Sequence, residues 1–319
     1  MNTQPPAPGS EPTLSIADVE RDTGLLKDTL RVWERRYGFP TPGRDAHGER
    51  RYDGAQLHKL RLIKRLLDAG HRPHQVVPLG TAELAELVQK IPAASTCQPM
   101  ESAANPLVEE WLRGLKDNRT EVLRRSLEDH LLRHGLASTI EDFISPTSMA
   151  VGQAWLLGEL SVFQEHLHTE IVQSVLREAL AVLDKQTVPA PHAPRVLLTT
   201  LPDEQHAMGL LMAECFLALE RCERFPLGAC TPLTDVVNAA RQLKVDVVAL
   251  SFSAHQPPND TVSGLRQLRE QLPEDVALWV GGGAPVLYSR RLPKGISALR
   301  KARDLGPLVS AWRRDRAGR

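Results

Sequence analysis

Residues 27–38 read KDTLRVWERRYG, and this stretch decides how the first part of the chain folds. Leu30 and Trp33 lie three residues apart, which places both on the inner face of a helix. The outward positions carry polar side chains, most of them long hydrogen-bond donors: Lys27, Thr29, Arg31, Arg35 and Arg36. Donors of this kind reach phosphates and guanine edges, so the helix is predicted to bind DNA.

The neighbouring segments complete a helix-turn-helix. A first helix begins after Ser15 as N-cap, and Gly24 forms the turn before the second helix. Residues 38–42 (GFPTP) cannot be helical, and residues 44–52 (RDAHGERRY) are predicted to form a β-hairpin wing against the DNA backbone. The wing residues expected at the DNA are Arg44, Arg50, Arg51 and Tyr52. Further helices are predicted at 55–69 and 81–90.

Charge alone leaves a second interpretation open. Residues 15–78 hold 13 Lys and Arg against 9 Asp and Glu, a modest excess that also fits the solvated face of a small helical domain. That alternative does not explain the order of helix, glycine turn, basic helix, proline break and basic wing. Residues 29–38 with 44–52 resemble the DNA-binding domain of MerR-type regulators. The resemblance covers residues 14–79 and implies a winged helix-turn-helix over 14–90 that binds a pseudo-palindromic operator as a dimer.

The rest of the 319 residues is long enough for further domains. Residues 91–105 are rich in Pro, Ala, Ser and Thr and are predicted to be a linker. Residues 106–186 show four helical segments with short breaks, which favours a four-helix bundle interrupted by Pro146. A second proline-rich linker covers 187–194. Residues 195–316 then alternate apolar strands with helices, which is typical of a doubly wound, Rossmann-like α/β sheet.

A histidine follows the first strand of this α/β segment. His206 lies in the loop that leaves the strand, where parallel sheets bind their ligands. Glu204 is placed to accept a hydrogen bond from the other imidazole nitrogen, and Gly209 allows close approach of a large planar ligand. A lone loop histidine is more often a solvated side chain. However, the next strands also end in small residues, namely Ser251, Ser253, Gly281, Gly282 and Gly283.

This spacing resembles the cobalamin-binding fold of methionine synthase and the base-off mutases. The resemblance implies that His206 is the lower axial ligand of cobalt. It also implies that the detached nucleotide tail enters a slot lined by the serine segment and the glycines. Glycine is needed there because any side chain at those positions would collide with the tail. The usual serine motif ends in Ser-x-Leu, whereas this chain has Ser-x-Ser at 251–253.

The helical segment adds a second resemblance. Trp155 is followed, after nine residues, by Glu165 and His166. Taken singly, Trp155 fits a bundle core and Glu165 a solvated helix. Together they resemble the light-sensing, adenosylcobalamin-dependent MerR-type repressors of the CarH kind, in which the tryptophan packs on the adenosyl group. Leu156 stands where many of those proteins carry a cobalt-capturing histidine, and His166 and His168 are nearby alternatives.

The resemblance implies a repressor, not an enzyme, that binds adenosylcobalamin, forms a tetramer in the dark and releases its operator in light. Two alternatives stay open: a regulator that senses cobalamin without light, and a corrinoid methyl carrier. A pocket that holds another chromophore or stays empty is a further interpretation, which the intact Glu204-x-His206 motif and the intact Trp155, Glu165 and His166 motif disfavour.

Composition sets the expected location. The 39 basic and 39 acidic residues balance, and no apolar run approaches the roughly 20 residues of a membrane span. Residues 1–12 are polar and proline-rich, without the features of a secretion signal. The four cysteines lack metal-binding spacing and are predicted to be reduced thiols. A cytoplasmic protein with no membrane partner is therefore expected.

Overall fold

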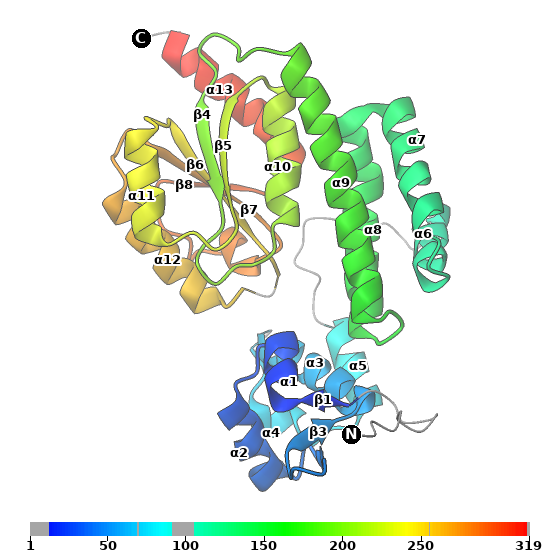
Figure 1. The fold of residues 1–319 in the computed structure, drawn as a ribbon. Coiled ribbons are helices and arrows are strands. Elements are labelled where there is room, and N and C mark those ends of the chain that lie inside the picture. Colours follow the sequence, from blue (N-terminus) through cyan, green and yellow to red (C-terminus); the bar gives the residue numbers. More distant parts are fainter. Residues whose placement is uncertain (1–12, 69, 91–104, 255, 318–319) are drawn as a thin grey trace, which may run out of the picture. The chain divides into compact units, whose positions relative to one another are not determined.

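The computed structural model describes residues 13–68, 70–90, 105–254 and 256–317 (Figure 1). These form two compact units. The first comprises the described residues up to Lys90 together with Ala154–Glu159, and the second comprises the described residues from 105 onward outside that segment. The predicted linker at 91–105 lies outside the described residues except for Asn105, which is the N-cap of the helix that follows.

The first unit begins with the helix-turn-helix predicted from the sequence. Helix α1 (Ile16–Thr23) starts at a capping box between Ser15 and Asp18 and ends at Gly24, whose φ is 68°. Helix α2 (Lys27–Tyr37) ends at Gly38, whose φ is 69°. Glycine adopts this left-handed conformation without the steric cost of a side chain, so both turns depend on it.

A small antiparallel sheet and three more helices follow. Strand β3 (Arg50–Tyr52) pairs with β1 (Leu14–Ser15) on one side and with β2 (Gly43–Arg44) on the other, so the predicted hairpin is formed. Helices α3 (Gly54–Asp68), α4 (Pro73–Val76) and α5 (Thr81–Lys90) close the unit. Leu30 and Trp33 are buried in its core, as predicted, and pack with apolar side chains of α3 and α5.

The second unit opens with a helical segment. It contains α6 (Pro106–Lys116), α7 (Thr120–Ser138), a π-helical turn η1 (Thr139–Ile144), α8 (Ser145–Leu156) and α9 (Val162–Gln186). The backbone of Gly135 is non-helical (φ 78°, ψ 168°), so α7 is kinked there. The third helix of this segment is predicted to be interrupted at Pro146, but the irregularity lies before it, in the π turn η1, and Pro146 lies in the first turn of α8, where proline is tolerated.

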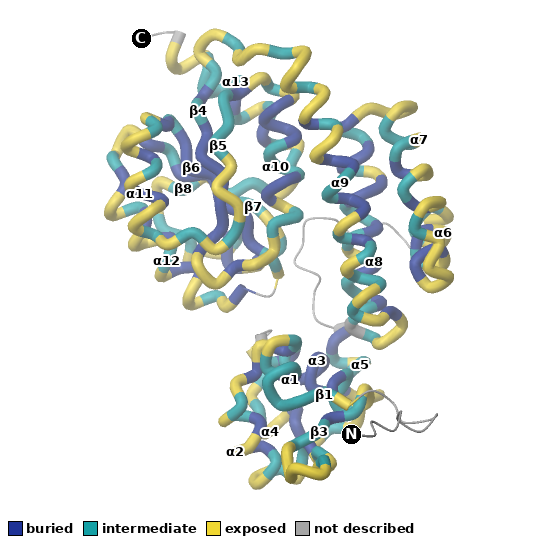
Figure 2. Tube along the Cα trace, in the orientation of Figure 1, coloured by how far each residue is buried: buried dark blue, intermediate teal, exposed yellow. Residues whose placement is uncertain are grey.

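A parallel α/β sheet completes the unit and confirms the predicted fold of this half. Within the described residues, the strand order is β5-β4-β6-β7-β8, with all pairs parallel. The strands are β4 (Arg195–Thr199), β5 (Glu223–Gly228), β6 (Val247–Phe252), β7 (Ala277–Gly282) and β8 (Ile296–Leu299). Every residue of β6, the central strand, is buried, as expected of a strand covered on both faces (Figure 2).

Helices cover both faces of this sheet. Helices α10 (Met208–Leu219) and α13 (Leu305–Ala317) lie on one face, and α11 (Leu233–Gln242) and α12 (Pro258–Gln271) lie on the other (Figure 1). Helix α9 packs against α10, which joins the helical segment to the sheet. Two short 3-10 turns, η2 (Pro285–Tyr288) and η3 (Ala302–Asp304), connect β7 to β8 and β8 to α13.

The helical segment contains a buried histidine whose protonation is linked to folding. The indole Nε1 of Trp111 donates to His168 Nδ1 at 3.0 Å, and His168 Nε2 lies 3.0 Å from Ser148 Oγ. Because indole can only donate, the neutral ring carries its proton on Nε2. Burial lowers the pKa of His168 to about 4.

We expect this histidine to make the protein less stable in acid. Between pH 6.5 and pH 4 the unfolded chain, whose histidine has an ordinary pKa of about 6.5, binds a proton that the folded chain does not bind. His168 therefore does not lower the free energy of unfolding above pH 6.5, and lowers it by up to about 3 kcal/mol as the pH falls toward 4. Urea unfolding from pH 7.5 to 4.5 should show a flatter profile for His168→Gln than for wild type. The exposed control His166→Gln should follow wild type, and identical slopes for all three proteins would refute the assignment.

Candidate functional site

The site is built on a buried carboxylate in the loop between β4 and α10. Glu204 is 1 % exposed, and its Oε1 accepts hydrogen bonds from the backbone N–H (2.9 Å) and ring Nδ1 (2.6 Å) of His206. Its Oε2 accepts from the backbone N–H of Ser253 at 2.8 Å, in the segment that follows β6. Glu204 thereby links the carboxyl ends of two neighbouring parallel strands and holds the His206 ring between them.

The charges of this pair determine the histidine tautomer. Burial alone would raise the pKa of Glu204, but the hydrogen bonds from His206 and Ser253 outweigh it and hold the pKa at about 2. The carboxylate is therefore ionised and can only accept, so Nδ1 of His206 is the donor. The hydrogen bond to Glu204 raises the pKa of His206, and the nearby charge of Glu165 acts in the same direction. A metal bound by this ring would be ligated through Nε2.

Two residues that the sequence analysis did not single out support the loop. The hydroxyl of Thr200, which is fully buried, donates to the carbonyl oxygen of Glu204 and accepts from the backbone N–H of Cys230 at 2.8 Å. Cys230, with a φ of 60°, also places its thiol 3.4 Å from the Glu204 carbonyl. A buried polar residue directly after an apolar strand is the sequence signal that could have identified Thr200.

A cavity of about 360 Å³ lies at the same end of the sheet and is lined by most of the predicted small residues. Gly209, Ser251 and the glycines 281–283 all contribute to it, whereas Ser253 does not. The inner wall is largely apolar and includes Ala249, Leu250, Trp279 and Val280. The structure thus brings the predicted residues from Gly209 to Gly283, which are distant in the sequence, around one hollow.

The physical reason for two of the glycines differs from the prediction. A Cβ on Gly282, whose φ is 116°, would lie 2.0 Å from the carbonyl oxygen of Phe252. A Cβ on Gly209 would lie 2.6 Å from Ser251 Oγ. Close packing within the chain therefore already requires glycine at 282, whatever ligand the cavity takes. Gly281 has ordinary space, with its nearest contact at 3.5 Å from the Leu299 carbonyl.

The tryptophan, glutamate and histidines that carry the resemblance to the light-sensing repressors differ in burial and in partners. Glu165 and His166 lie in the first turns of α9, where Glu165 accepts from Thr169 Oγ1 at 3.0 Å and His166 is 70 % exposed. His168, offered as an alternative cobalt ligand, is buried with its two ring nitrogens bonded to Trp111 and Ser148, so it does not face a ligand site. Trp155 lies in the last turn of α8, in the segment that belongs to the first unit.

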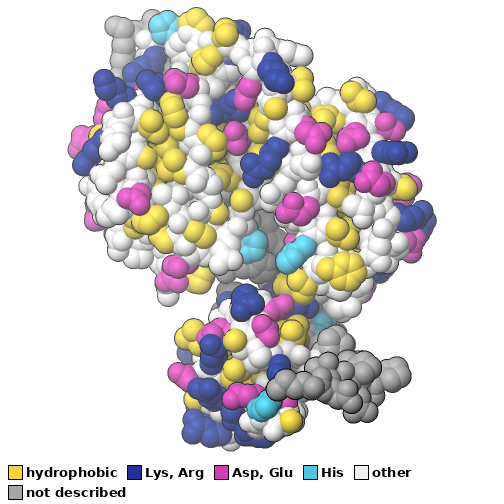
Figure 3. All heavy atoms as spheres, viewed as in Figure 1, with side chains coloured by type: hydrophobic (Ala, Val, Ile, Leu, Met, Phe, Trp, Pro, Cys, Tyr) yellow, Lys and Arg dark blue, Asp and Glu magenta, His cyan; other side chains and the backbone are white. Residues whose placement is uncertain are grey.

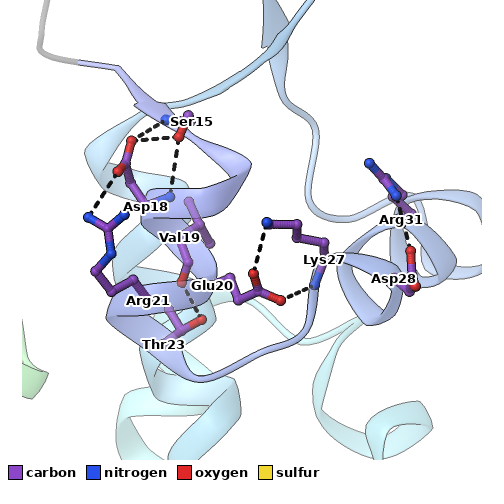
Figure 4. A network of polar contacts seen from close by, with 9 residues as sticks. All are labelled: Ser15, Asp18, Val19, Glu20, Arg21, Thr23, Lys27, Asp28 and Arg31. Atoms are coloured by element: carbon purple, nitrogen blue, oxygen red, sulfur yellow. Dashed lines mark hydrogen bonds and ion pairs between the residues drawn. The ribbon is translucent and has the colours of Figure 1, made fainter.

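The helix-turn-helix carries its basic side chains within a network of ion pairs (Figure 4). Asp18 bonds Ser15 and pairs with Arg21, while Glu20 of α1 pairs with Lys27 at the start of α2 (3.2 Å). Glu20 also accepts from the Lys27 backbone N–H at 3.0 Å, which fixes the entry of α2 relative to α1. The pair formed by Arg31 and Asp28 is on the exposed side of α2.

The remaining residues predicted to contact DNA differ in their exposure and in their partners. Arg35 and Arg36 are exposed on α2, and Lys and Arg side chains gather over this end of the first unit (Figure 3). Arg50 pairs with Glu34 of α2 (2.8 Å), which ties the hairpin to that helix, and Arg51 pairs with Asp45 within the hairpin (3.0 Å). Tyr52 is fully buried in the core, and so the structure places its ring away from any DNA surface. Thr29 is half-buried, and Arg44 donates to the Gly48 carbonyl at 2.7 Å across the hairpin.

Known proteins match this chain either over its helix-turn-helix segment or over most of its length. The family model for MerR HTH regulatory proteins matches residues 14–77. The HTH-type transcriptional repressor CarA of Myxococcus xanthus is 31 % identical over 304 residues, which cover 94 % of this chain and 96 % of CarA. The chain belongs to the CarA and CarH family of MerR-type transcriptional repressors. CarH of the same organism is 29 % identical over 280 residues, covering 86 % of this chain and 90 % of CarH.

The second unit of this family member has a likeness among solved structures. The monomethylamine corrinoid protein of Methanosarcina barkeri matches with a TM-score of 0.51 at 15 % identity, covering 64 % of this chain and 96 % of that one. At this identity the likeness concerns the fold alone. Among the described residues of the repressor, no helix combines the length and apolar character needed to cross a membrane.

The crowding at Gly282 yields a test on this repressor that needs no ligand. Gly282→Ala should lower the free energy of unfolding by about 3 kcal/mol or more, because the added carbon meets a backbone carbonyl in a conformation that only glycine adopts readily. Gly281→Ala is the matched control and should cost less than about 1 kcal/mol. Denaturant unfolding of both variants without cofactor measures the difference. Equal losses would show that the crowding does not set the requirement.

Proposed function

We propose that this family member is a repressor whose binding to operator DNA is controlled by a bound corrinoid, adenosylcobalamin. The observation that carries the proposal is the pair formed by Glu204 and His206 at the carboxyl ends of the parallel strands, the end of the sheet where the cavity also lies. A buried, ionised carboxylate holds Nδ1 as a donor and so directs Nε2 to the metal, an arrangement found around metal-binding histidines. The adjacent apolar cavity suits the planar base of a nucleotide tail that has left the metal.

The donor set itself favours a corrinoid over a simple metal ion. Among the described residues, no group of three or more His, Cys, Asp or Glu side chains forms a metal site. A single histidine is sufficient only where the metal already has its other ligands, as cobalt has in a corrin ring. His206 would ligate the cobalt through Nε2, and Gly209, Ser251 and Gly281–Gly283 would receive the tail. The relatives' role as repressors and the fold likeness to a corrinoid protein support this assignment.

We further infer that light is the signal. When bound, adenosylcobalamin supplies a cobalt–carbon bond that visible light breaks. In this proposal the helices α6–α9 form the cap above the corrin, and Trp155, with Glu165 and His166, recognises the adenosyl group. The capped form self-associates into a tetramer in the dark, which places several DNA-binding heads on one operator and raises avidity. Loss of the adenosyl contact shifts the equilibrium of the cap, and the assembly releases the DNA.

One alternative has a specific observation in its favour. Leu156 directly follows Trp155, at the position where many light-sensing relatives carry a histidine, and the ring of His168 is engaged elsewhere. A regulator that senses only the presence of the cofactor does not need a histidine to capture cobalt after photolysis. A methyl-carrier role is disfavoured by the helix-turn-helix at residues 14–77.

Light sensing is tested by size-exclusion chromatography of the full chain with adenosylcobalamin. In the dark wild type should elute as a large assembly, and illumination should dissociate it. Trp155→Ala should still bind the cofactor but elute alike in dark and light, because the differential contact that biases the equilibrium is gone. Wild type loaded with hydroxocobalamin is the control and should not change on illumination. Should adenosylcobalamin-loaded wild type elute identically under both conditions, the cofactor-presence sensor takes the place of the photoreceptor.

DNA binding is tested through its salt dependence. Arg35→Ala with Arg36→Ala removes two exposed cations of α2, and the slope of log affinity against log salt should become shallower by about two units if both contact phosphates. Arg21→Ala, an exposed cation on α1, should leave the slope unchanged. Fluorescence anisotropy with an operator fragment between about 50 and 200 mM salt measures all three proteins. Equal slopes for the double variant and wild type would remove α2 as the DNA-binding element.

A further inference from the structure

Trp155, the residue proposed to recognise the adenosyl group, has a partner within the first unit. That unit includes Ala154–Glu159, which comprises the end of α8 and the turn after it. The guanidinium of Arg61, in α3, lies over the Trp155 ring, 4.6 Å from the ring centroid. A guanidinium over an indole face is attracted by the electrons of the ring. An indole that packs on another group therefore has to give up this contact or share it.

Arg61 cannot follow the indole, because a carboxylate holds it in place. Its Nε and Nη2 donate to Oδ1 and Oδ2 of Asp22 at 2.7 and 2.6 Å, which joins α3 to α1. The Arg61 side chain is only 8 % exposed, so its charge depends on this bidentate partner whatever the indole does. Any separation of the two side chains therefore has to be a movement of Trp155 away from a fixed Arg61.

Two polar atoms have no partner where this segment packs on α3. The indole Nε1 of Trp155 and the ring Nδ1 of His58 are both buried, and within the described residues neither has a hydrogen-bond partner. A Cβ on Gly158 would lie 3.0 Å from His58 Nδ1, so the backbone of the turn runs directly against that ring. Buried polar atoms without partners are unfavourable. The attraction between Arg61 and Trp155 is thus offset by a cost that disappears when the indole leaves.

The end of α8 does not depend on α3 for its own shape. The backbone N–H of Glu159 donates to the Ala154 carbonyl at 2.8 Å, and that of Gly158 donates to the Trp155 carbonyl at 3.1 Å. These two bonds, with a φ of 74° at Gly158, form the Schellman motif that closes a helix. The segment that carries Trp155 can therefore leave α3 as a folded piece.

We propose that Arg61 and the adenosyl group compete for Trp155, so that the adenosyl form of the cofactor releases the end of α8 from the DNA-binding unit. This inference rests on the proposed function and adds the residue through which the DNA-binding unit senses the cofactor. The adenosyl group offers oxygen and nitrogen acceptors for the indole N–H, which the packing on α3 leaves without one. A ligand that binds one of two arrangements shifts the equilibrium toward it. Arg61 therefore lowers the affinity for adenosylcobalamin and leaves the affinity for a cobalamin without that group unchanged.

The test measures how tightly the full chain binds two cobalamins in the dark, adenosylcobalamin and hydroxocobalamin, by the change in corrinoid absorbance. Asp22→Asn with Arg61→Gln is the test variant, since it removes the guanidinium and leaves no buried charge without its partner. Asp22→Asn alone is the matched control, because it keeps Arg61 over the indole. Circular dichroism of both proteins checks that the first unit is folded.

The expected result is a gain in affinity. The test variant should bind adenosylcobalamin about three- to tenfold more tightly than the control, while both bind hydroxocobalamin equally. Adding Trp155→Ala to both proteins should abolish the difference, because the indole is the group for which the two partners compete. Gly158→Ala is a second variant that leaves the ion pair intact. Its Cβ meets the His58 ring only while the turn is packed on α3, so it should also favour adenosylcobalamin.

Other outcomes overturn the inference in distinguishable ways. Equal affinity of the test variant and the control for adenosylcobalamin would show that Arg61 does not oppose the cofactor. Weaker binding of adenosylcobalamin alone would show that Arg61 and the adenosyl group share the indole. An equal change for both cobalamins, or a gain that survives Trp155→Ala, would show that the effect does not pass through the indole. Failure of wild type to bind either cobalamin would overturn the corrinoid function itself, and the competition with it.

Discussion

The buried carboxylate of Glu204 is the interaction on which the site depends. A lone buried charge is strongly unfavourable, and it is tolerated here because three donors converge on it from the His206 ring and from the backbones of His206 and Ser253. Those donors come from the loops after β4 and β6, so the charge can be satisfied only when the two loops meet. The orientation of the His206 ring is a consequence of that meeting.

The residues that hold the His206 ring are buried, whereas the ring itself is exposed. Glu204 and Thr200 are buried and fix the loop, whereas the His206 side chain is 61 % exposed and can meet a large planar ligand. The same division recurs at the ends of β7 and β8, where the Tyr288 hydroxyl bonds the carbonyl oxygens of Gly282 and Leu299 and the exposed Arg300 lies over the Tyr288 ring. Rigid elements thus hold a small number of accessible groups in place, as ligand sites require.

The sequence predicted the elements with strong local signals and missed those without them. The cap at Ser15, the glycine turn at 24, the end of the second helix before residues 38–42, and the apolar strands β4, β6 and β7 are all predictable because each has a local physical cause. Strand β8 has only four residues and no alternation, and α13 begins with Leu305-Gly306-Pro307, which is typical of a loop. Both form because the sheet and α10 offer a surface to pack on, which is tertiary information.

Side-chain partners were the least predictable part of the site. The pairing of Glu204 with His206 followed from their spacing, since a loop carboxylate two residues away can reach the ring. The burial of His168 depends on its contact with Trp111, which is 57 residues away in the sequence. The burial of Tyr52 in the core of the first unit depends on the register of its strand with β1. The cavity was anticipated from its glycines, although the crowding that requires Gly282 lies in the backbone of Phe252.

If His206 ligates the cobalt of a bound corrinoid, the bond between its nitrogen and cobalt is detectable by electron paramagnetic resonance. The full chain is loaded with cob(II)alamin, once unlabelled and once with nitrogen-15 histidine. A nitrogen-14 ligand, of spin one, splits the cobalt lines into triplets, and a nitrogen-15 ligand, of spin one-half, splits them into doublets. With His206 as the ligand, the unlabelled protein shows triplets and the protein with nitrogen-15 histidine shows doublets. The His206→Ala protein shows neither splitting. Triplets that persist in the labelled protein would show that the cofactor's own base is the ligand and would contradict the account.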